Sequence, residues 1–135
     1  MSNCLFCKII NKEIPATIVY EDADILAFLD INPVNIGHTL VIPKLHTQDM
    51  NSADDATLAK LAIATSHIAR AVQKGLGVTG YNLEVNNGDV AGQIIFHSHW
   101  HIIPRFADDG LKHWPGKKYA EGEANLVAEK IKSSL

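Results

Sequence analysis

Three of the seven histidines in this chain lie within five residues of one segment, residues 96–104 (FHSHWHIIP). Most of their neighbours are aromatic or β-branched, as is typical of a strand. Side chains in a strand alternate between its two faces, so His97, His99 and His101 are expected to share one face over about 13 Å. The segment therefore predicts a row of imidazole rings along one side of a strand.

The other face of this segment is mainly apolar. Phe96, Trp100 and Ile102 alternate with the histidines, and only Ser98 is a poor residue for a core. With a strand over 93–103, this face is expected to pack into the interior. The histidine face would then line the edge of a cleft.

Three imidazoles in register can perform chemistry that a single one cannot. Neutral imidazole is a nucleophile and a metal ligand, and its unperturbed pKa of about 6.5 lets one ring attack while another donates a proton. A solvent-exposed face that carries histidines is the simpler alternative. Three rings opposite apolar residues favour the chemical alternatives, which are metal binding and phosphoryl or nucleotidyl chemistry.

The two cysteines of the chain, Cys4 and Cys7, form a C-x-x-C motif. In a reducing compartment this spacing is more often a metal or redox site than a structural disulfide. A closed zinc site would need two further ligands. The alternative is that the cysteines are simply small residues beside a pocket.

The bulk composition is that of one soluble domain, residues 1–135. Apolar residues make up 47% and charged residues 20%, and the net charge is −3 with no basic run. This balance argues against nucleic acid or an anionic membrane as the main partner. No apolar stretch approaches the roughly 20 residues of a membrane span, and no signal peptide is recognised, so we expect a cytoplasmic protein.

The local patterns predict an α+β fold in which strands joined by short turns pair antiparallel and one long helix covers the sheet. The helix is expected to begin at a capping box over 52–55 and to end at Gly75 and Gly77. The other expected elements are a short helix in 4–12, a hairpin of strands 17–20 and 25–29, strands at 38–43, 81–86 and 93–103, and a closing helix in 123–132.

The segment Gly92 to His101, read as G-Q-x-x-x-H-x-H-x-H, resembles the signature of the histidine triad (HIT) family. FLDINPVNIGHTLVIPKLH (28–46) resembles the nucleotide-pocket segment of that family, and CLFCKIINKEIP (4–15) resembles its N-terminal segment. Asn86 and the glycine-containing loop after it fit as well. The resemblance covers nearly the whole chain and is closest to the bacterial members of the Hint-like branch.

The resemblance implies a HIT-like fold with a five-stranded antiparallel sheet, one long helix and short terminal helices. It also implies a homodimer whose two sheets join into ten strands. The implied activity is hydrolysis at the α-phosphorus of purine nucleotides through a covalent nucleotidyl-histidine. A glutamine at the third triad position would be similar to the uridylyltransferases, whereas His101 favours hydrolysis.

The residue roles implied by the resemblance centre on the triad. His99 is the expected nucleophile, His101 contacts phosphate and protonates the leaving group, His97 completes the triad, and His38 holds hydrogen bonds beside it. Asp30 is expected to bind the ribose hydroxyls. The other expected nucleotide-binding residues are Leu5, Phe6, Ile9, Phe28, Ile31 and Leu40 around the base, and Asn86, Gly92, Gln93 and Ile94 with His99 and His101 around the phosphate.

From the residues alone, several of these positions have simpler interpretations. Phe28, Ile31 and Leu40 could be ordinary core. Asp30 could form a turn before Pro33. Asn86 likewise begins a good turn sequence. Ile94 stands where Hint-type proteins often carry a serine, so a hydroxyl contact to phosphate is missing and only the backbone N–H remains.

The resemblance also implies ligands for a structural zinc ion. Some bacterial HIT proteins bind zinc through a C-x-x-C and two histidines, which correspond here to Cys4, Cys7, His46 and His97. No organic cofactor is expected. With His97 on the metal, His99 and His101 remain for chemistry.

Four functions remain open from the sequence. The first is a phosphoramidase that releases a nucleoside monophosphate from phosphoramidates or nucleotidyl-lysine, and the second is a dinucleoside polyphosphate hydrolase. The third is a nucleotide-sensing regulatory module with little turnover. The fourth is a zinc-binding structural protein, for which His101 would have no evident task.

Overall fold

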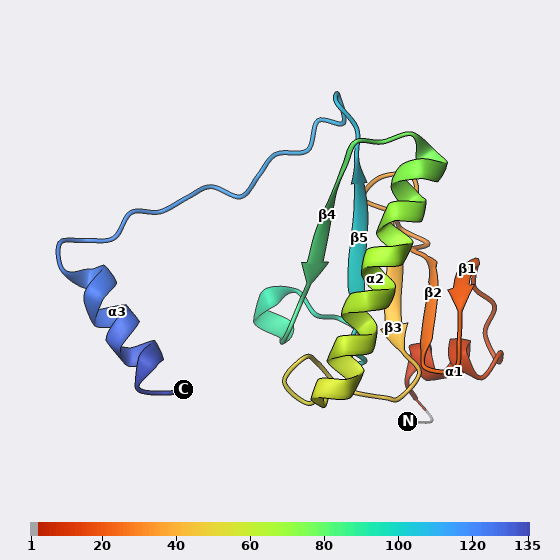
Figure 1. Ribbon diagram of the computed structural model, residues 1–135, viewed down its shortest axis with the longest axis horizontal. Helices are drawn as coiled ribbons and strands as arrows, with labels where there is room; N and C mark the ends of the chain where they lie inside the picture. The colour runs from red at the N-terminus through yellow and green to blue at the C-terminus, as the bar shows by residue number, and fades with distance from the viewer. Residues whose placement is uncertain (1–2) are drawn as a thin grey trace.

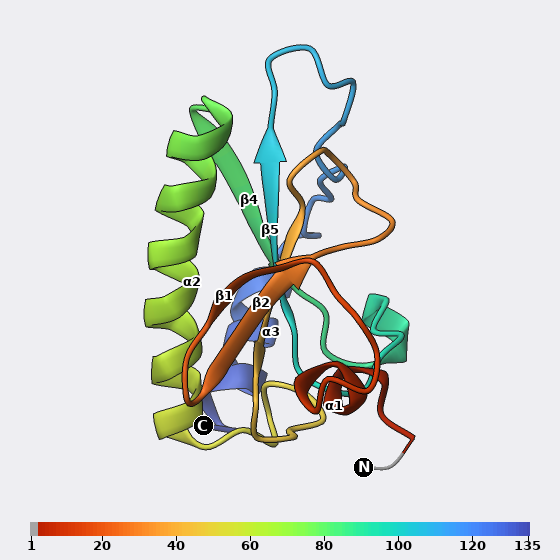
Figure 2. The same cartoon turned by 90° about the vertical axis from the view of Figure 1, so that its right-hand side faces the viewer.

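The computed structural model describes residues 3–135. A five-stranded antiparallel sheet forms its centre, with strand order β1-β2-β3-β5-β4. The long helix α2 covers one face of the sheet and the short helix α1 lies on the other (Figures 1 and 2). The elements are α1 (Leu5–Ile10), β1 (Ile18–Glu21), β2 (Ile25–Leu29), β3 (Thr39–Pro43), α2 (Asp55–Leu76), β4 (Gly80–Val85), the 3-10 turn η1 (Asp89–Ala91), β5 (Trp100–Arg105) and α3 (Glu123–Lys132). The α+β fold expected from the sequence is therefore confirmed.

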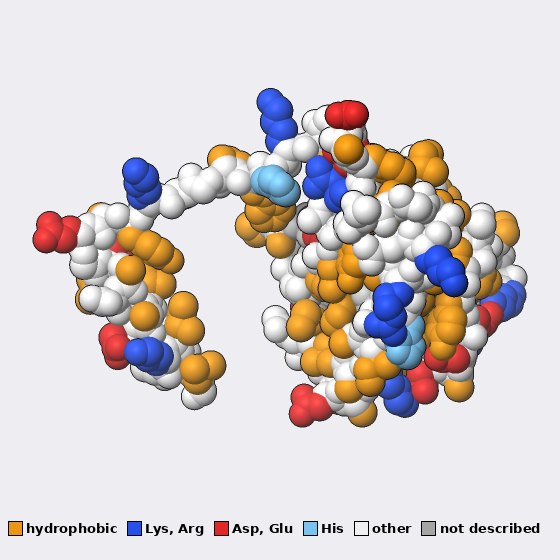
Figure 3. All heavy atoms as spheres, turned by 45° about the horizontal axis from the view of Figure 1, so that its top comes forward, with side chains coloured by type: hydrophobic (Ala, Val, Ile, Leu, Met, Phe, Trp, Pro, Cys, Tyr) orange, Lys and Arg blue, Asp and Glu red, His pale blue; other side chains and the backbone are white. Residues whose placement is uncertain are grey.

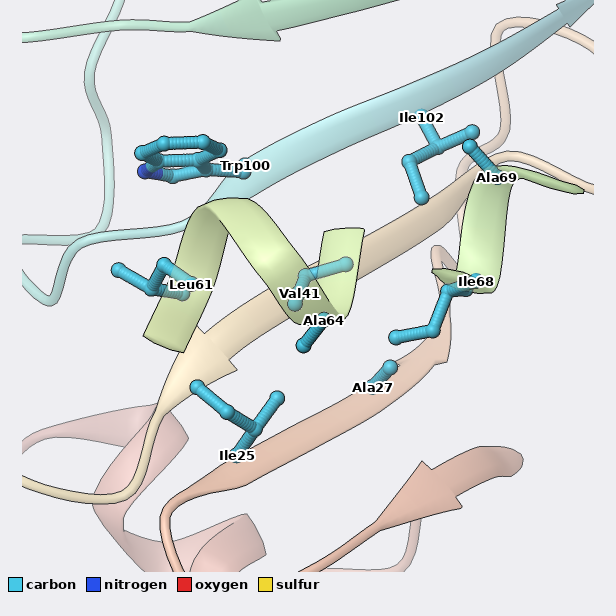
Figure 4. Close-up of a cluster of buried hydrophobic side chains, with 9 residues drawn as sticks. All are labelled: Ile25, Ala27, Val41, Leu61, Ala64, Ile68, Ala69, Trp100 and Ile102. Carbon is cyan, nitrogen blue, oxygen red and sulfur yellow. The ribbon is translucent and has the colours of Figure 1, made fainter. Parts of the chain in front are cut away.

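The main core lies between α2 and the sheet (Figure 4). Apolar residues of α2 recur at helical spacing and meet side chains that point to one face of β2, β3 and β5. Trp100 and Ile102 belong to this core, as their alternation with the histidines predicted. The buried cluster consists of Ile25, Ala27, Val41, Leu61, Ala64, Ile68, Ala69, Trp100 and Ile102.

Leu61 is 0% exposed in this core, whereas Ile63 on the same helix is 60% exposed. Leu61→Ala is expected to lower the free energy of unfolding by about 2–5 kcal/mol, because it removes buried methyl groups and leaves a cavity. Ile63→Ala removes similar groups from a site that is largely exposed. It should change the free energy of unfolding by less than about 1 kcal/mol. Urea denaturation of both variants checks this, and equal losses would place the core elsewhere.

A second buried cluster fills the space between α1 and the opposite face of the sheet. Phe6 and Ile9 are the two buried residues of α1. They pack on Leu26, Phe28, Leu40 and Ile42 from β2 and β3. Two apolar layers therefore fix α1 against the sheet face that also carries His99 and His101.

The histidine strand is shorter than the sequence predicted. The prediction of a strand over 93–103 is wrong at its beginning, because β5 starts at Trp100. The register of β3 against β5 pairs Val41 with Trp100, so Pro43 would stand opposite Ser98. Proline has no N–H to donate to the ladder, and pairing stops there.

The consequence for Phe96 is that it does not reach the core. It lies ahead of β5 and is 44% exposed, so its expected burial is also wrong. The segment is nonetheless held in place, since the Ser98 N–H donates to the carbonyl of Thr47 at 2.6 Å. His97, Ser98 and His99 are all buried.

The start of α2 is also displaced from the expected capping box. The N-cap is Asp54, whose carboxylate accepts from the Thr57 N–H at 2.8 Å. Ser52 instead closes a separate turn with Asp49. The helix ends as expected at Gly77, which adopts a left-handed conformation with φ 67°.

After β5 the chain runs past the β4 edge of the sheet to α3, which lies apart from the rest of the molecule (Figure 1). The bounds of α3 match the helix expected over 123–132, and none of its residues is buried. Among residues 3–135, no helix combines the length and apolar character that a membrane crossing requires.

Candidate active site and metal-binding cluster

A cavity of about 410 Å³ opens on the face of the sheet that α1 covers. Its volume lies in the usual range for a small-molecule site, and its walls are mainly apolar with a few polar groups. His99 and His101 contribute to its lining, so the strand alternation brings both rings to one place. The lining residues are Leu5, Phe6, Ile9, Ile14, Pro15, Ala16, Phe28, Leu29, Asp30, Ile31, Asn32, Leu40, Asn86, Gly92, Ile94, Ile95, His99 and His101.

The hydrogen bonds of His99 define which of its nitrogens is free. Nδ1 lies 2.8 Å from the carbonyl oxygen of His97, which can only accept, so Nδ1 carries the proton. Burial lowers the pKa of His99 below its ordinary value, so the ring is neutral near pH 7. Nε2 therefore carries an unshared lone pair. This is the tautomer that a nucleophile or a metal ligand requires.

His101 has the complementary tautomer, because a chain of hydrogen bonds orients it. The backbone N–H of Val34 donates to Nδ1 of His38 at 3.0 Å, so the proton of neutral His38 sits on Nε2. That nitrogen lies 2.9 Å from Nδ1 of His101. His101 therefore carries its proton on Nε2, a buried atom that has no partner within residues 3–135.

Burial keeps the hydrogen-bonded rings of His38 and His101 neutral. It lowers the pKa of His101 to about 4, and the nearby rings of His99 and His38 add to the effect. It also lowers the pKa of His38, while the charge of Asp30 acts in the opposite direction. The Asp30 carboxylate lies 3.8 Å from Nε2 of His38 and would stabilise any charged imidazole that forms during a reaction.

Because neutral His101 is favoured in the folded state, stability should fall in acid. Above the pKa of the unfolded chain, about 6.5, His101 does not change the free energy of unfolding with pH. Between that pH and about pH 4, protonation of the unfolded chain lowers the free energy of unfolding progressively. The slope is at most about 1.4 kcal/mol per pH unit for this one histidine. Urea denaturation at pH 7.5 and pH 5.0 should show a smaller acid loss for His101→Gln than for the unmodified protein. Equal losses in the two proteins would rule out His101 as the source.

Asp30 both forms a turn and lines the cavity. One carboxylate oxygen accepts from the Asn32 N–H at 2.8 Å, which is the turn-forming contact that the simpler interpretation predicted. The residue also lines the cavity, as the resemblance implied. Its side chain is 21% exposed, so the carboxylate stays accessible to hydroxyl groups of a ligand.

The loop between β4 and β5 differs from the expected phosphate cradle. The backbone N–H groups of Gly92 and Gln93 donate to Asp89 and Gly88 inside the loop. The Gln93 side chain is 3% exposed and outside the cavity lining. It holds the loop instead, by accepting from the Gly88 N–H and donating to the Gln48 and Ile95 carbonyls.

The donors that remain for an anion come from two other residues of the same loop. Asn86 lines the cavity, and its side-chain amide makes no hydrogen bond within residues 3–135. The backbone N–H of Ile94 is likewise without a partner in the described part of the chain, and the Ile94 side chain is 84% exposed. Gly92, at φ +95°, brings this loop back beside the Asn86 side chain.

The apolar wall was expected for the most part but not completely. The six residues expected around the base all line the cavity, although Ile31 is 91% exposed and stands at its rim. Ile14, Pro15, Ala16, Leu29, Asn32 and Ile95 also line it and were not identified from the sequence. Their types are common in turns and cores, so no local pattern marks them as binding residues.

The C-x-x-C motif meets two histidines beside this cavity. Cys4 is the N-cap of α1, and its sulfur accepts from the Cys7 N–H. Ligand atoms of Cys4, Cys7, His46 and His97 all lie within 4.8 Å of one another. Nδ1 of His97 is 3.1 Å from Nδ1 of His46, 3.5 Å from the Cys4 sulfur and 3.6 Å from the Cys7 sulfur.

The chemistry of this cluster fits a tetrahedral metal ion. His97 lies with Nε2 2.7 Å from the Pro43 carbonyl, which places its proton there and leaves Nδ1 bare toward the sulfurs. Burial lowers the pKa of His97 to about 4 and raises that of the Cys7 thiol to about 11. Two sulfurs and two imidazole nitrogens are a zinc-type donor set. Cys4, Cys7, His46 and His97 would hold such an ion.

The cysteine–histidine cluster is physically connected to the ring of His99. His97 turns its ring to the cysteines while its carbonyl orients His99. Phe6, next to Cys7 in α1, contacts both rings edge-on, with centroids 5.9 Å from His97 and 5.1 Å from His99. The position of α1 therefore affects both the cavity and the three histidines of residues 97–101.

Comparisons with known proteins agree with this fold. The HIT domain model matches residues 11–108. An uncharacterized HIT-like protein of Methanocaldococcus jannaschii is 52% identical over 107 residues, covering 79% of this chain and 82% of that protein. A crystal structure from Streptococcus mutans is 41% identical with a TM-score of 0.94, covering 99% of this chain and 86% of that one. The chain belongs to the HIT family.

Two other similar proteins carry names that bear on chemistry. One is an adenosine 5′-monophosphoramidase of Schizosaccharomyces pombe, 38% identical over 135 residues and covering 98% of each chain. The other is a zinc-bound histidine triad family protein of Mycobacterium smegmatis, 38% identical with a TM-score of 0.79 and covering 99% of each chain.

Proposed function

We propose that this protein hydrolyses nucleotides at the α-phosphorus, releasing a purine nucleoside monophosphate from a phosphoramidate or nucleotidyl-lysine adduct. One observation carries the proposal. His99 offers a bare Nε2 and His101 offers a protonated Nε2, and both rings line one apolar cavity with centroids 4.9 Å apart. One ring can attack phosphorus while its neighbour donates a hydrogen bond to the reacting phosphate.

In the first step, Nε2 of His99 attacks the α-phosphorus and forms an N–P bond. The bond from phosphorus to the leaving amine breaks, and the amine departs neutral because its nitrogen has taken up a proton from solvent before the step. The Nε2–H group of His101 donates a hydrogen bond to a phosphate oxygen and keeps its proton. His38 donates to Nδ1 of His101 and so holds the proton on the side of the cavity. The Asp30 carboxylate stabilises the positive charge that develops on His99.

In the second step, water attacks phosphorus and displaces His99, which regains its lone pair on Nε2. The water gives up one proton to solvent, which balances the proton that the amine took up, and the nucleoside monophosphate departs. Dividing the displacement into two steps lets each one proceed through a good leaving group. The Asn86 amide and the Ile94 N–H are the donors available to the phosphate oxygens.

The cavity supports a nucleoside as the group that is held. Phe6, Phe28 and Leu40 supply an apolar wall for a base, and the Asp30 carboxylate can accept from ribose hydroxyls. The phosphoramidase name of the Schizosaccharomyces pombe relative supports the same substrate class. We assign the Cys4, Cys7, His46 and His97 cluster to a structural zinc ion, because all four ligand positions would come from the protein.

The same proposal includes a homodimer joined along β4. β4 is an edge strand, so its outer side has no neighbour in the sheet. Tyr81 and Leu83 of β4 are 37% and 49% exposed, and pairing two copies of β4 would cover both and give a ten-stranded sheet.

Turnover of adenosine 5′-phosphoramidate and of diadenosine tetraphosphate, measured in parallel by chromatography of AMP, tests the substrate class. Faster release of AMP from the phosphoramidate is expected, because a cavity of about 410 Å³ suits one nucleoside. Faster turnover of the tetraphosphate would assign the protein to the dinucleoside polyphosphate hydrolases. Nucleotide binding without turnover of either compound would instead indicate a regulatory module.

A further inference from the structure

The C-terminal helix α3 is not packed against the rest of the chain over the described residues 3–135. None of its ten residues is buried, and Ile131 is 59% exposed. Figure 3 shows the segment as a separate lobe, joined to the body by a thin length of chain, with hydrophobic side chains toward the body. A ten-residue helix is marginal in water unless one face packs against something. α3 therefore requires an apolar surface.

The apolar residues of α3 form one stripe. Ala124, Val127, Ala128 and Ile131 recur at spacings of three and four, which places them along one side of the helix. Leu126 lies on the opposite side and is 68% exposed. One side of α3 is thus suited to a shallow apolar groove.

The chain leaves β5 in a direction that is held by hydrogen bonds. The Asp109 carboxylate accepts from the Arg105 guanidinium at 2.8 Å and from the backbone N–H of Leu111 at 3.0 Å. It also accepts from the Asn35 side chain, and Asp109 is only 6% exposed. This network fixes the direction in which the chain leaves β5. Residues 112–122 then pass the β4 edge, and α3 lies beyond that edge of the sheet (Figure 1).

A matching groove lies at the other edge of the sheet, between α2 and β1. It has a volume of about 470 Å³, and its lining is mainly apolar. All four residues of β1 are exposed, and Val19 is 49% exposed. The lining residues are Val19, Tyr20, Leu29, Ile36, Gly37, Thr39, His67, Ile68, Ala71, Val72, Gly75 and Leu76.

We propose that α3 of one chain packs its apolar stripe into the groove between α2 and β1 of a second copy of this chain. The course of the tail identifies the occupant, because α3 lies beyond β4 while the groove of its own chain lies at the β1 edge. A second copy that pairs along β4 occupies the space that the tail crosses. Two-fold symmetry then makes the exchange reciprocal, so each groove receives one helix.

The test is an isotope-filtered NOE experiment on dimers mixed from methyl-labelled and unlabelled full-length chains. NOEs are expected between methyl groups of Val127 or Ile131 in one chain and those of Val19 or Ala71 in the other. NOEs found only within a single chain would show that α3 folds back on its own groove. The absence of any NOE between α3 and the groove would also overturn the proposal.

Point variants of the full chain give an independent readout by sedimentation. Ile131→Asp and Val19→Asp should each raise the dissociation constant of the dimer at least about tenfold, because each places a charge in an apolar contact that occurs twice. Leu126→Asp and Ile63→Asp put the same charge on exposed apolar positions outside the contact. These two variants should leave the dissociation constant of the dimer unchanged. Equal effects of all four variants would contradict the proposed contact. Because sedimentation and NOEs do not depend on turnover, their failure is distinguishable from failure of the proposed enzymatic function.

Discussion

Replacing His99 with glycine is expected to reduce the turnover of adenosine 5′-phosphoramidate by a factor on the order of 10⁴ or more. The variant removes the nitrogen that attacks phosphorus, and His101 cannot substitute because its Nε2 carries a proton and its Nδ1 is engaged by His38. Nucleotide binding should be largely kept, since the apolar wall and Asp30 are untouched. Single-turnover rates and equilibrium binding of AMP check the two halves of this expectation.

The matched control is His113→Gly. His113 is an exposed histidine of the C-terminal segment and should have no effect on the chemical step. Rapid acid-free quenching of the unmodified enzyme during turnover should also reveal a chain heavier by one nucleotidyl group, which His99→Gly lacks. Turnover by His99→Gly within about tenfold of the unmodified enzyme would exclude nucleophilic catalysis by this residue.

Disabling the metal cluster is expected to have the largest effect on stability. Cys7→Ser should abolish zinc binding, measured as zinc per chain, and should lower the melting temperature by about 10–15 °C. That shift corresponds to loss of a ligand present at about 1,000 times its dissociation constant, which is worth about 4 kcal/mol. The shift is plausible here because the cluster joins the start of α1 to the segments that carry His46 and His97.

A second consequence of metal loss should appear in nucleotide binding. α1 carries Phe6, which contacts His97 and His99 and lines the cavity, so a loosened α1 should weaken AMP binding as well. His113→Gly serves again as the control, because it removes an imidazole that takes no part in the cluster. If the purified protein holds no zinc and a chelator leaves its melting temperature unchanged, the four residues do not form a metal site.

Local sequence patterns were sufficient to predict which face of the strand carries His99 and His101. Alternation along one strand placed His99 and His101 on one side and Trp100 and Ile102 on the other, and the structure keeps this arrangement. Helical spacing and a terminal glycine likewise predicted α2 and its end at Gly77. Such features follow from backbone periodicity, which acts over a few residues and can be read without knowing the rest of the fold.

The resemblance to the family supplied what periodicity could not, namely the roles of residues far apart in the chain. His46 and His97 are separated by 51 positions, and no spacing rule could bring them together. The same is true of His38, which is separated from His101 by 63 positions. The structure brings His46 to His97 and the cysteines and hydrogen-bonds His38 to His101. Gln93, by contrast, holds the loop and does not line the cavity.

What only the tertiary structure decided concerns contacts between distant segments. Pro43, in a neighbouring strand, ends the ladder and delays the start of β5, which leaves Phe96 exposed. The tautomers of His99 and His101 depend on a carbonyl, a backbone N–H and a second imidazole. The direction of the C-terminal segment depends on Asp109 and its partners. Hydrogen-bond partners of this kind are fixed by how strands and loops meet in space, so residue types and spacing along the chain cannot specify them.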